Sequence, residues 1–148
     1  MAANAWIVYD KAKERILKGE AIALGTHDIR CELVTTDYTP LSTAHEYKSD
    51  ISDNITSSAQ YPSGGVLTSG IAITRSNGTI TFDANDFNFS PTSSVTISAK
   101  YAVLYDDSTT SECLICYSAL SSATGPPAAS TNGTFQIQLD ASGIFTLA

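Results

Sequence analysis

Charged residues are scarce in this sequence, and so are several residue types that carry chemistry. Only 16% of the 148 residues are charged, and the chain holds three cysteines, two histidines and one tryptophan. An odd number of cysteines excludes a full disulfide framework, so we expect reduced thiols. No apolar run approaches the length of a membrane span, and residues 1–9 lack the basic start of a secretory signal. We therefore expect neither a disulfide-rich secreted domain nor a membrane protein.

The remaining composition indicates one globular domain that is rich in β-structure. Hydrophobic residues make up 43% of the chain, the mean hydropathy is zero, and the length suits a single core. Serine and threonine fill roughly a quarter of the positions, more than an average protein has. Hydroxyl side chains of this kind are suited to the outward faces of β-strands.

The net charge of −7 is unevenly distributed along the chain. The first 32 residues hold five of the eight basic residues, balanced by five acids, so the whole negative excess falls on residues 33–148. A region with this negative charge repels the phosphate backbone of nucleic acids, which argues against nucleic acid as a partner.

One helix is expected, near the N-terminus. Asp10 is a suitable N-cap, Gly19 a suitable C′ residue, and Lys18 suits the negative end of the helix dipole. The spacing predicts one apolar face and one basic outward face, made up of Tyr9, Ala12, Ile16 and Leu17 on the first and Lys11, Glu14, Arg15 and Lys18 on the second. Such a helix either covers one end of a β-sandwich or docks on an acidic protein surface.

Beyond Gly19 the hydrophobic period changes to two, which is typical of strands. We predict strands over 29–34, 66–74, 79–82, 95–105 and 112–120, and a final hairpin of 134–139 with 144–147. Asn77-Gly78 predicts a tight turn between its two neighbouring strands, which would place Ile71 and Ile73 across from Ile80 and Phe82 on the core face. The segments 35–65 and 121–133 are expected to be loops, the first of them a candidate binding surface. The predicted organisation is an N-terminal arm and helix (1–20) followed by a mainly antiparallel β-sandwich or jelly-roll-like domain (21–148).

No pattern of residues indicates catalysis, a metal or a cofactor. His27-Asp28 and His45-Glu46 stand alone, without a third ligand nearby in the sequence. Cys113 and Cys116 have redox spacing, but a strand would point them to opposite faces as two small buried hydrophobic residues. The acidic turn 83–86 lacks the glycine and distal glutamate of a calcium-binding EF-hand loop. We expect a protein that is not an enzyme and that binds other proteins.

Several stretches, in order along nearly the whole chain, resemble small structural proteins of tailed-phage (cyanophage-like) heads. They are residues 5–19, 33–40 with His45-Glu46-Tyr47, 64–67 leading to 81–86, 97–105, and 133–135 leading to 143–147. The resemblance implies a capsid decoration (cement) protein with a β-sandwich or jelly-roll fold. It further implies a homotrimer on the outer surface of the virion head, assembled in the host cytoplasm, with the major capsid protein as its partner.

Within this interpretation the N-terminal segment, the helix and the 35–65 loop are expected to contact the capsid or neighbouring protomers. The candidate contact residues are Trp6, Tyr9, Lys11, Lys13, Arg15, Lys18, Tyr38, Tyr47 and Tyr61. The alternative is a head-fibre or tail module that binds a host receptor or glycan, with Tyr38, Tyr47 and Tyr61 as stacking platforms.

Overall fold

A computed structural model describes residues 1–2, 4–52, 62, 64–91 and 96–148, and it confirms a mainly β, antiparallel fold with one α-helix. The helices are α1 (Asp10–Lys18) and a 3₁₀ turn, η1 (Lys48–Asp50). The strands are β1 (Ile7–Val8), β2 (Ile29–Val34), β3 (Val66–Leu67), β4 (Ala72–Ser76), β5 (Thr79–Asp83), β6 (Phe87–Phe89), β7 (Thr96–Ala99), β8 (Tyr101–Asp106), β9 (Cys113–Ala119), β10 (Ala128–Thr131), β11 (Phe135–Ile137) and β12 (Phe145–Leu147).

The largest sheet has five strands in the order β1-β9-β8-β2-β3, all antiparallel to their neighbours. Nearly every side chain of its three inner strands, β2, β8 and β9, is buried, including the carboxylates of Glu32 and Asp106. A prediction of one buried and one exposed face for 29–34 is therefore wrong, because β2 lies between two strands and is covered on both sides.

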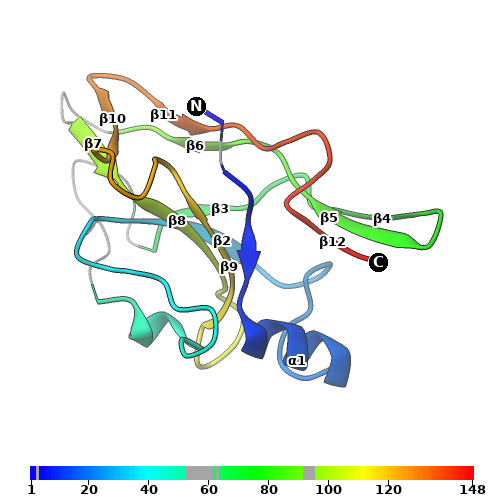
Figure 1. Ribbon diagram of the computed structural model, residues 1–148. Helices are drawn as coiled ribbons and strands as arrows, with labels where there is room; N and C mark the ends of the chain where they lie inside the picture. The colour runs from blue at the N-terminus through cyan, green and yellow to red at the C-terminus, as the bar shows by residue number, and fades with distance from the viewer. Residues whose placement is uncertain (3, 53–61, 63, 92–95) are drawn as a thin grey trace.

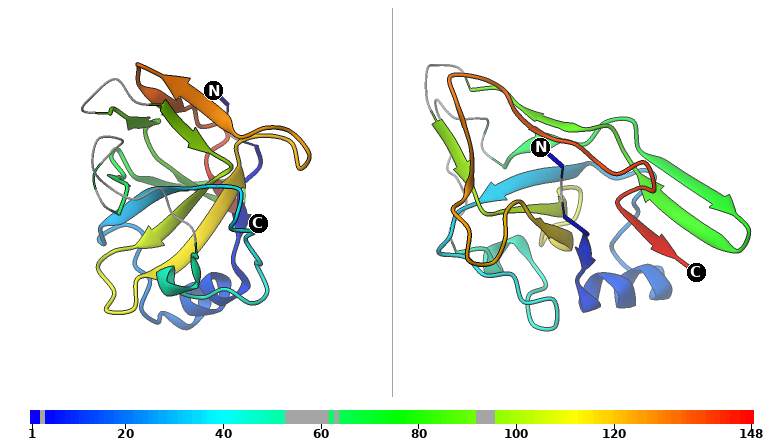
Figure 2. Two further views of the ribbon diagram at one scale, coloured as in Figure 1. Left: turned by 90° about the vertical axis from the view of Figure 1, so that its left-hand side faces the viewer. Right: turned by 45° about the horizontal axis from the view of Figure 1, so that its top comes forward.

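A second layer covers this sheet and completes a sandwich-like arrangement (Figures 1 and 2). It contains two short ladders, β7 with β10 and β6 with β11. Their aromatic and aliphatic side chains join those of the five-stranded sheet in a single hydrophobic core, and the largest contributors are Phe87, Phe89, Ile97, Phe135 and Ile137. This packing fixes the positions of the surrounding strands and of α1.

A third sheet, β12-β5-β4, extends from one end of the body. Its β4–β5 hairpin projects away from the rest of the chain (Figure 1). The predicted Asn-Gly turn is confirmed, since Asn77 and Gly78 both have positive φ angles, 49° and 84°. The prediction that 144–147 pairs with 134–139 is wrong, because β12 pairs with β5 and β11 pairs with β6.

Two predicted long strands are each interrupted in the structure. The 66–74 segment divides into β3 and the start of β4 at Gly70, where φ is +63°. The 95–105 segment breaks at Lys100, whose backbone N–H donates to Val34 and whose carbonyl accepts from Leu120. The predicted loop 121–133 contains one strand, β10.

Lys100 is buried, and its side chain explains the break between β7 and β8. The ammonium group donates hydrogen bonds to the Ser121 hydroxyl (3.0 Å) and to the carbonyls of Ser122 and Gly125 (2.8 Å for Gly125). A buried cation requires such acceptors, because desolvation without them is costly. The bend places the ammonium group against the turn that follows β9.

Helix α1 forms where the sequence predicts it, with two differences in detail. Tyr9 takes the N-cap position and Asp10 begins the first turn, while Gly19 ends the helix with a φ of 68°. Arg15 is buried and Leu17 is 84% exposed, the reverse of the predicted faces. The reason is that Arg15 finds a carboxylate and an aromatic ring on the neighbouring loop. No helix among the described residues is both long and apolar enough to cross a membrane.

Candidate functional site

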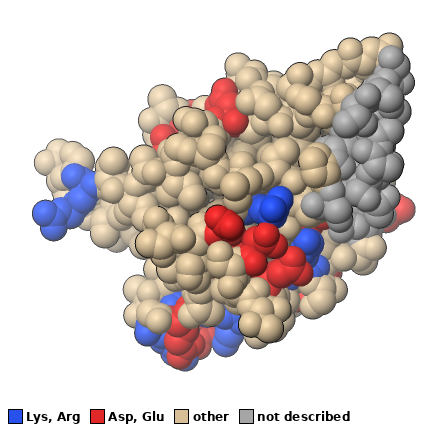
Figure 3. Space-filling view, turned by 180° about the vertical axis from the view of Figure 1, so that it is seen from behind, with Lys and Arg blue, Asp and Glu red and all other residues tan. Residues whose placement is uncertain are grey.

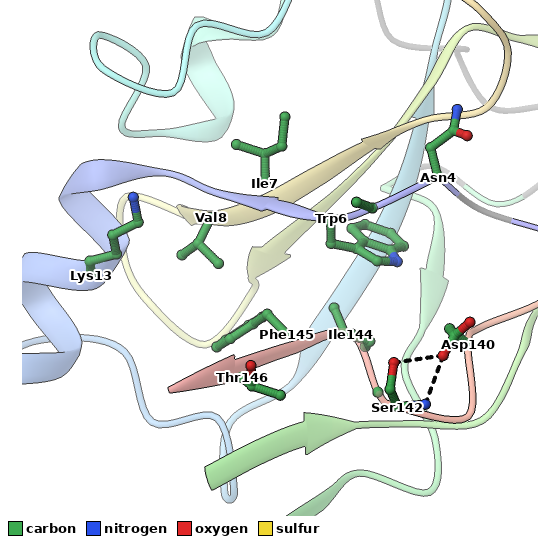
Figure 4. A pocket seen from close by; sticks show the side chains of 12 residues that line it. Asn4, Trp6, Ile7, Val8, Lys13, Asp140, Ser142, Ile144, Phe145 and Thr146 are labelled. Atoms are coloured by element: carbon green, nitrogen blue, oxygen red, sulfur yellow. Dashed lines mark hydrogen bonds between the residues drawn. The ribbon is translucent and has the colours of Figure 1, made fainter. Parts of the chain in front are cut away.

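An open groove of about 600 Å³ runs between the N-terminal strand β1 and the C-terminal strand β12 (Figure 4). Val8 points toward Phe145 on β12, and Ile7 points away from it (Figure 4). Lys13 lies at one end of the groove. At the other end lies a turn in which Asp140 accepts hydrogen bonds from the Ser142 hydroxyl and backbone N–H, which lower the pKa of Asp140. The groove therefore has apolar side chains along its walls and a charged residue at each end, Lys13 and Asp140.

Trp6, one of the candidate contact residues, lines this groove. Its ring lies edge-on to Phe87 with 6.2 Å between centroids, which ties the N-terminal segment to the core. The indole Nε1 is buried and has no hydrogen-bond partner among the described residues. A buried N–H without an acceptor carries a desolvation cost. A rearrangement that brings an acceptor to the Trp6 indole would therefore lower the free energy of the protein.

A second surface lies beyond β12, where α1 faces the β12-β5-β4 sheet. Between them is an apolar hollow of about 260 Å³, and its lining is entirely aliphatic or aromatic: Ile16, Ile22, Leu24, Ile73, Ile80, Phe82, Phe145 and Leu147. It continues past Leu17 toward the groove through an intervening hollow, which shares Ile16, Phe145 and Leu147 with it. The same intervening hollow shares Val8, Lys13, Phe145 and Thr146 with the groove. We call the exposed part of this surface the hairpin patch, defined by Leu17, Ile73, Ile80 and Leu147.

The strand register explains why the hairpin patch is apolar. Phe82 lies directly opposite Ile73 on one side and Phe145 on the other, and Ile80 lies opposite Leu147. Residues opposite one another point to the same face of a sheet, so these five side chains share one face. Phe82 is buried, whereas Ile73, Ile80 and Leu147 are 50%, 41% and 42% exposed.

The opposite face of the same three strands carries hydroxyl groups. Thr81 lies between Thr74 on β4 and Thr146 on β12. The sheet is thus apolar on one side and polar on the other, although the apolar side extends past the protein body. The sequence predicted this alternation but assigned Ile73 and Ile80 to the core. Ile73 and Ile80 are exposed because the hairpin projects away from the protein body. A local sequence pattern does not encode where a hairpin lies relative to the body.

The basic residues of α1 are largely neutralised by acids of the same helix. Lys11 and Lys18 both form ion pairs with Glu14, at 2.8 and 2.6 Å, and Lys13 pairs with Asp10 at 2.8 Å. The hydrogen bonds from Lys11 and Lys18 lower the pKa of Glu14 to about 2. Arg15 is buried against the loop. Of the two helix interpretations, the structure therefore favours one in which α1 covers the end of the sheets.

Two of the candidate contact tyrosines are core residues, which corrects their assignment. Tyr9 and Tyr38 are buried, and their hydroxyl oxygens lie 3.3 Å apart. Burial raises the pKa of both hydroxyls. Neither side chain has surface to offer a partner or a glycan. Tyr47 is half-buried beneath Arg15, and Tyr61 lies outside the described residues.

Both histidines have structural partners. His27 Nδ1 lies 2.7 Å from the buried Asp106 carboxylate, whose other oxygen accepts the Ser108 N–H. His45 Nδ1 accepts the Leu41 N–H, and the Tyr38 hydroxyl lies 2.8 Å from the same nitrogen. Among the described residues no three His, Cys, Asp or Glu side chains gather in a way that would hold a metal ion.

The cysteines and the acidic turn also have structural surroundings. Cys31, Cys113 and Cys116 are free and buried, so the prediction of small buried hydrophobic residues at 113 and 116 is confirmed. In the 83–86 turn, Asp83 accepts the Ala84 N–H and Asp86 accepts the Leu139 N–H. These carboxylates cap the backbone of their own and a neighbouring segment.

Charged side chains gather in a few mixed clusters on the back face of the molecule, with wide uncharged surface between them (Figure 3). One charged group with a defined partner is Arg30, whose ion pair with Asp107 (2.7 Å) raises the pKa of Arg30. Another is Lys48, which contacts Glu112 (3.1 Å) and lies over the Tyr105 ring. The groove and the hairpin patch lie outside these ion pairs.

Comparison with known proteins found no matching family model, curated protein or solved structure. What the two surfaces do is therefore inferred from their own geometry.

Proposed function

We propose that this chain is a virion structural protein, a capsid decoration (cement) protein that binds the outer surface of a phage head as an oligomer and stabilises it. The observation that supports it best is the groove between β1 and β12, an accessible cleft with apolar and polar side chains on its walls and a charged residue at each end, Lys13 and Asp140. The sequence resemblance to phage head proteins points the same way. The major capsid protein is the partner in this proposal.

The groove is suited to a polypeptide segment of the shell. It is open along its length, and its walls are strands from the two ends of the chain, which present backbone groups as well as side chains. β1 and β12 are each the last strand of their sheet, and an outermost strand has one row of backbone groups that no neighbouring strand covers. Extended peptides commonly bind at such edges.

Stabilisation of the head then follows from mass action. A protein that binds the assembled shell but not its separated subunits shifts the equilibrium toward the shell. An oligomer that contacts several capsid subunits gains effective concentration for its second and third contacts, so each groove need bind only weakly.

The alternative, a receptor- or glycan-binding module, has less support among the described residues. It relied on Tyr38, Tyr47 and Tyr61 as a stacking platform. Tyr38 is buried and Tyr47 already stacks beneath Arg15, so these two rings are occupied within the protein. Binding of the purified protein to a glycan array, with no binding to heads, would favour the alternative.

The decisive experiment measures occupancy of purified, undecorated heads by matched variants. Deletion of residues 1–19 is unsuitable because it removes Tyr9 and Ala12 from the core. Lys13→Asp is better, since the Lys13 side chain is 51% exposed and lies at one end of the groove. Leu67→Asp is its control, because Leu67 is 52% exposed on β3, at the opposite edge of the same sheet.

We expect Lys13→Asp to lower head occupancy at least tenfold, a loss of about 1.4 kcal/mol per site or more, and Leu67→Asp to leave it unchanged. Occupancy that is the same for both variants and the wild type would contradict the groove as the binding site. Failure of the wild-type protein to bind heads at all would contradict the function itself.

A further inference from the structure

Among the described residues, the hairpin patch gathers several exposed large hydrophobic side chains. Its four residues, Leu17, Ile73, Ile80 and Leu147, lie around two adjoining hollows that share Ile16, Phe145 and Leu147. Their exposed fractions add up to about two whole side chains, an apolar area on the order of a few hundred Å², which is the size of patch that marks protein contacts.

The hairpin gains little support from its own chain at the tip. β4 pairs only with β5, and it is the last strand of its sheet. The tip beyond Ile80 is two-stranded, because β12 ends at Leu147, opposite Ile80. A two-stranded hairpin is marginally stable in water unless its apolar face is covered. The tip half of this hairpin projects beyond the body, with Ile73 and Ile80 half-exposed (Figure 2). A partner that covers this face would stabilise it.

The patch carries both a projection and a matching hollow. Leu17 projects from α1 with 84% of its surface exposed. Beside it is the aliphatic hollow of about 260 Å³ formed by α1, the hairpin and β12, which is large enough to receive a leucine side chain. A surface that holds both complementary parts can pair with a copy of itself, since each copy then supplies one projection and one hollow.

Charge also favours a second copy. Two copies of a chain with a net charge of −7 repel each other over most of their surfaces. The residues that line the hollow and its continuation along α1 contain no acid, and Lys13 is the one charged residue among them. The repulsion between copies is therefore smallest where these patches meet.

We propose that the hairpin patch is a self-association surface, through which copies of this chain form a closed oligomer with Leu17 of one copy in the apolar hollow of another. This deepens the proposed function, which already includes an oligomer, by naming the surface through which the copies associate. Self-association itself requires no capsid, so the two can fail separately.

The test is the mass of the purified full-length protein at micromolar concentration, measured by sedimentation velocity or light scattering. We expect the wild type to be a dimer or trimer. Ile73→Asp and Leu17→Gln should each weaken association at least tenfold and give mostly monomer. Both positions are exposed within one chain, so the variants should fold, as circular dichroism and a cooperative melt would verify.

Thr74→Asp is the matched control, since Thr74 follows Ile73 on the same strand and points to the hydroxyl face. It adds the same charge one residue away and should leave the oligomer intact. A monomeric wild type, or oligomers that persist equally in Ile73→Asp and Thr74→Asp, would overturn the proposal. A variant that is monomeric yet still binds heads, with lower occupancy, would separate self-association from capsid binding.

Discussion

The guanidinium group of Arg15 lies 4.7 Å from the centre of the Tyr47 ring. The same group lies 3.4 Å from the Glu46 carboxylate and 3.3 Å from the Glu46 carbonyl oxygen. Helix α1 is thereby joined to a loop some thirty residues later, and the loop leads directly into η1. This contact holds the helix against the end of the β-sheets.

Arg15→Ala should therefore destabilise the protein by about 2 kcal/mol, because Arg15 is buried and its removal leaves the space against the Tyr47 ring unfilled. Lys11→Ala, which removes an exposed ion pair on the same helix, should have a much smaller effect. Urea unfolding of the two variants beside the wild type measures both values. Equal effects would show that the Arg15 contact contributes no more than a surface pair.

Gly65 should tolerate no side chain. Its φ is +79°, and a Cβ atom built there would overlap the Cys31 carbonyl oxygen on β2. Gly65→Ala is expected to cost more than about 3 kcal/mol, through both strain and displacement of β2. Gly19→Ala, with a similar φ and open space around it, should cost about 1 kcal/mol. Thermal or urea unfolding would distinguish the two, and similar losses would mean that the chain moves away at Gly65 at little cost.

The thiols of Cys31 and Cys116 should be unreactive in the folded protein. Both are fully buried, and burial raises their pKa well above the ordinary value for cysteine. Since the thiolate is the reactive form, a thiol reagent at pH 8 should label neither residue under native conditions and both in denaturant. Peptide mapping after labelling identifies the positions. Rapid labelling of either residue in the native protein would contradict this packing.

Acidification should weaken the loop before η1 through Asp50. Its carboxylate accepts the backbone N–H groups of Glu46 (2.8 Å) and Tyr47 (2.9 Å), and these bonds lower its pKa below the ordinary value for aspartate. A lowered pKa in the folded state adds stability that is present above about pH 4 and is lost as the pH falls through the folded value.

Asp50→Asn keeps an acceptor but does not titrate, so it should be less stable than the wild type by about 0.5 kcal/mol at pH 6. The difference should shrink toward zero as the pH falls below 4. Urea unfolding of both proteins from pH 3 to pH 6 checks this, and a constant difference across the range would contradict the role of Asp50.

The parts of the fold that the sequence predicted correctly are those determined by local patterns. Strands β2, β8 and β9 are visible as apolar segments, and Asn77-Gly78 determines a hairpin turn by its backbone preferences alone. Gly19 likewise ends the helix as expected.

The errors arose where distant residues decide the outcome. Arg15 is buried because Glu46 and Tyr47 come to it, and Leu17 is then left outside. The pairing of β11 with β6 instead of β12 depends on packing across the sandwich, which periodicity cannot reveal. The hairpin patch was missed for the same reason, because an alternating strand has the same pattern whether its apolar face is covered by its own chain or by another.

Because Lys100 supplies a positive charge, the turn after β9 is held together without a bound metal ion. Many loops that gather several carbonyl oxygens around one point do so on a bound calcium or potassium ion, and they loosen when a chelator removes it. Here the positive centre is an ammonium group covalently attached to the neighbouring strand, held by Ser121, Ser122 and Gly125. The order of this turn should therefore be the same in EDTA as in millimolar calcium.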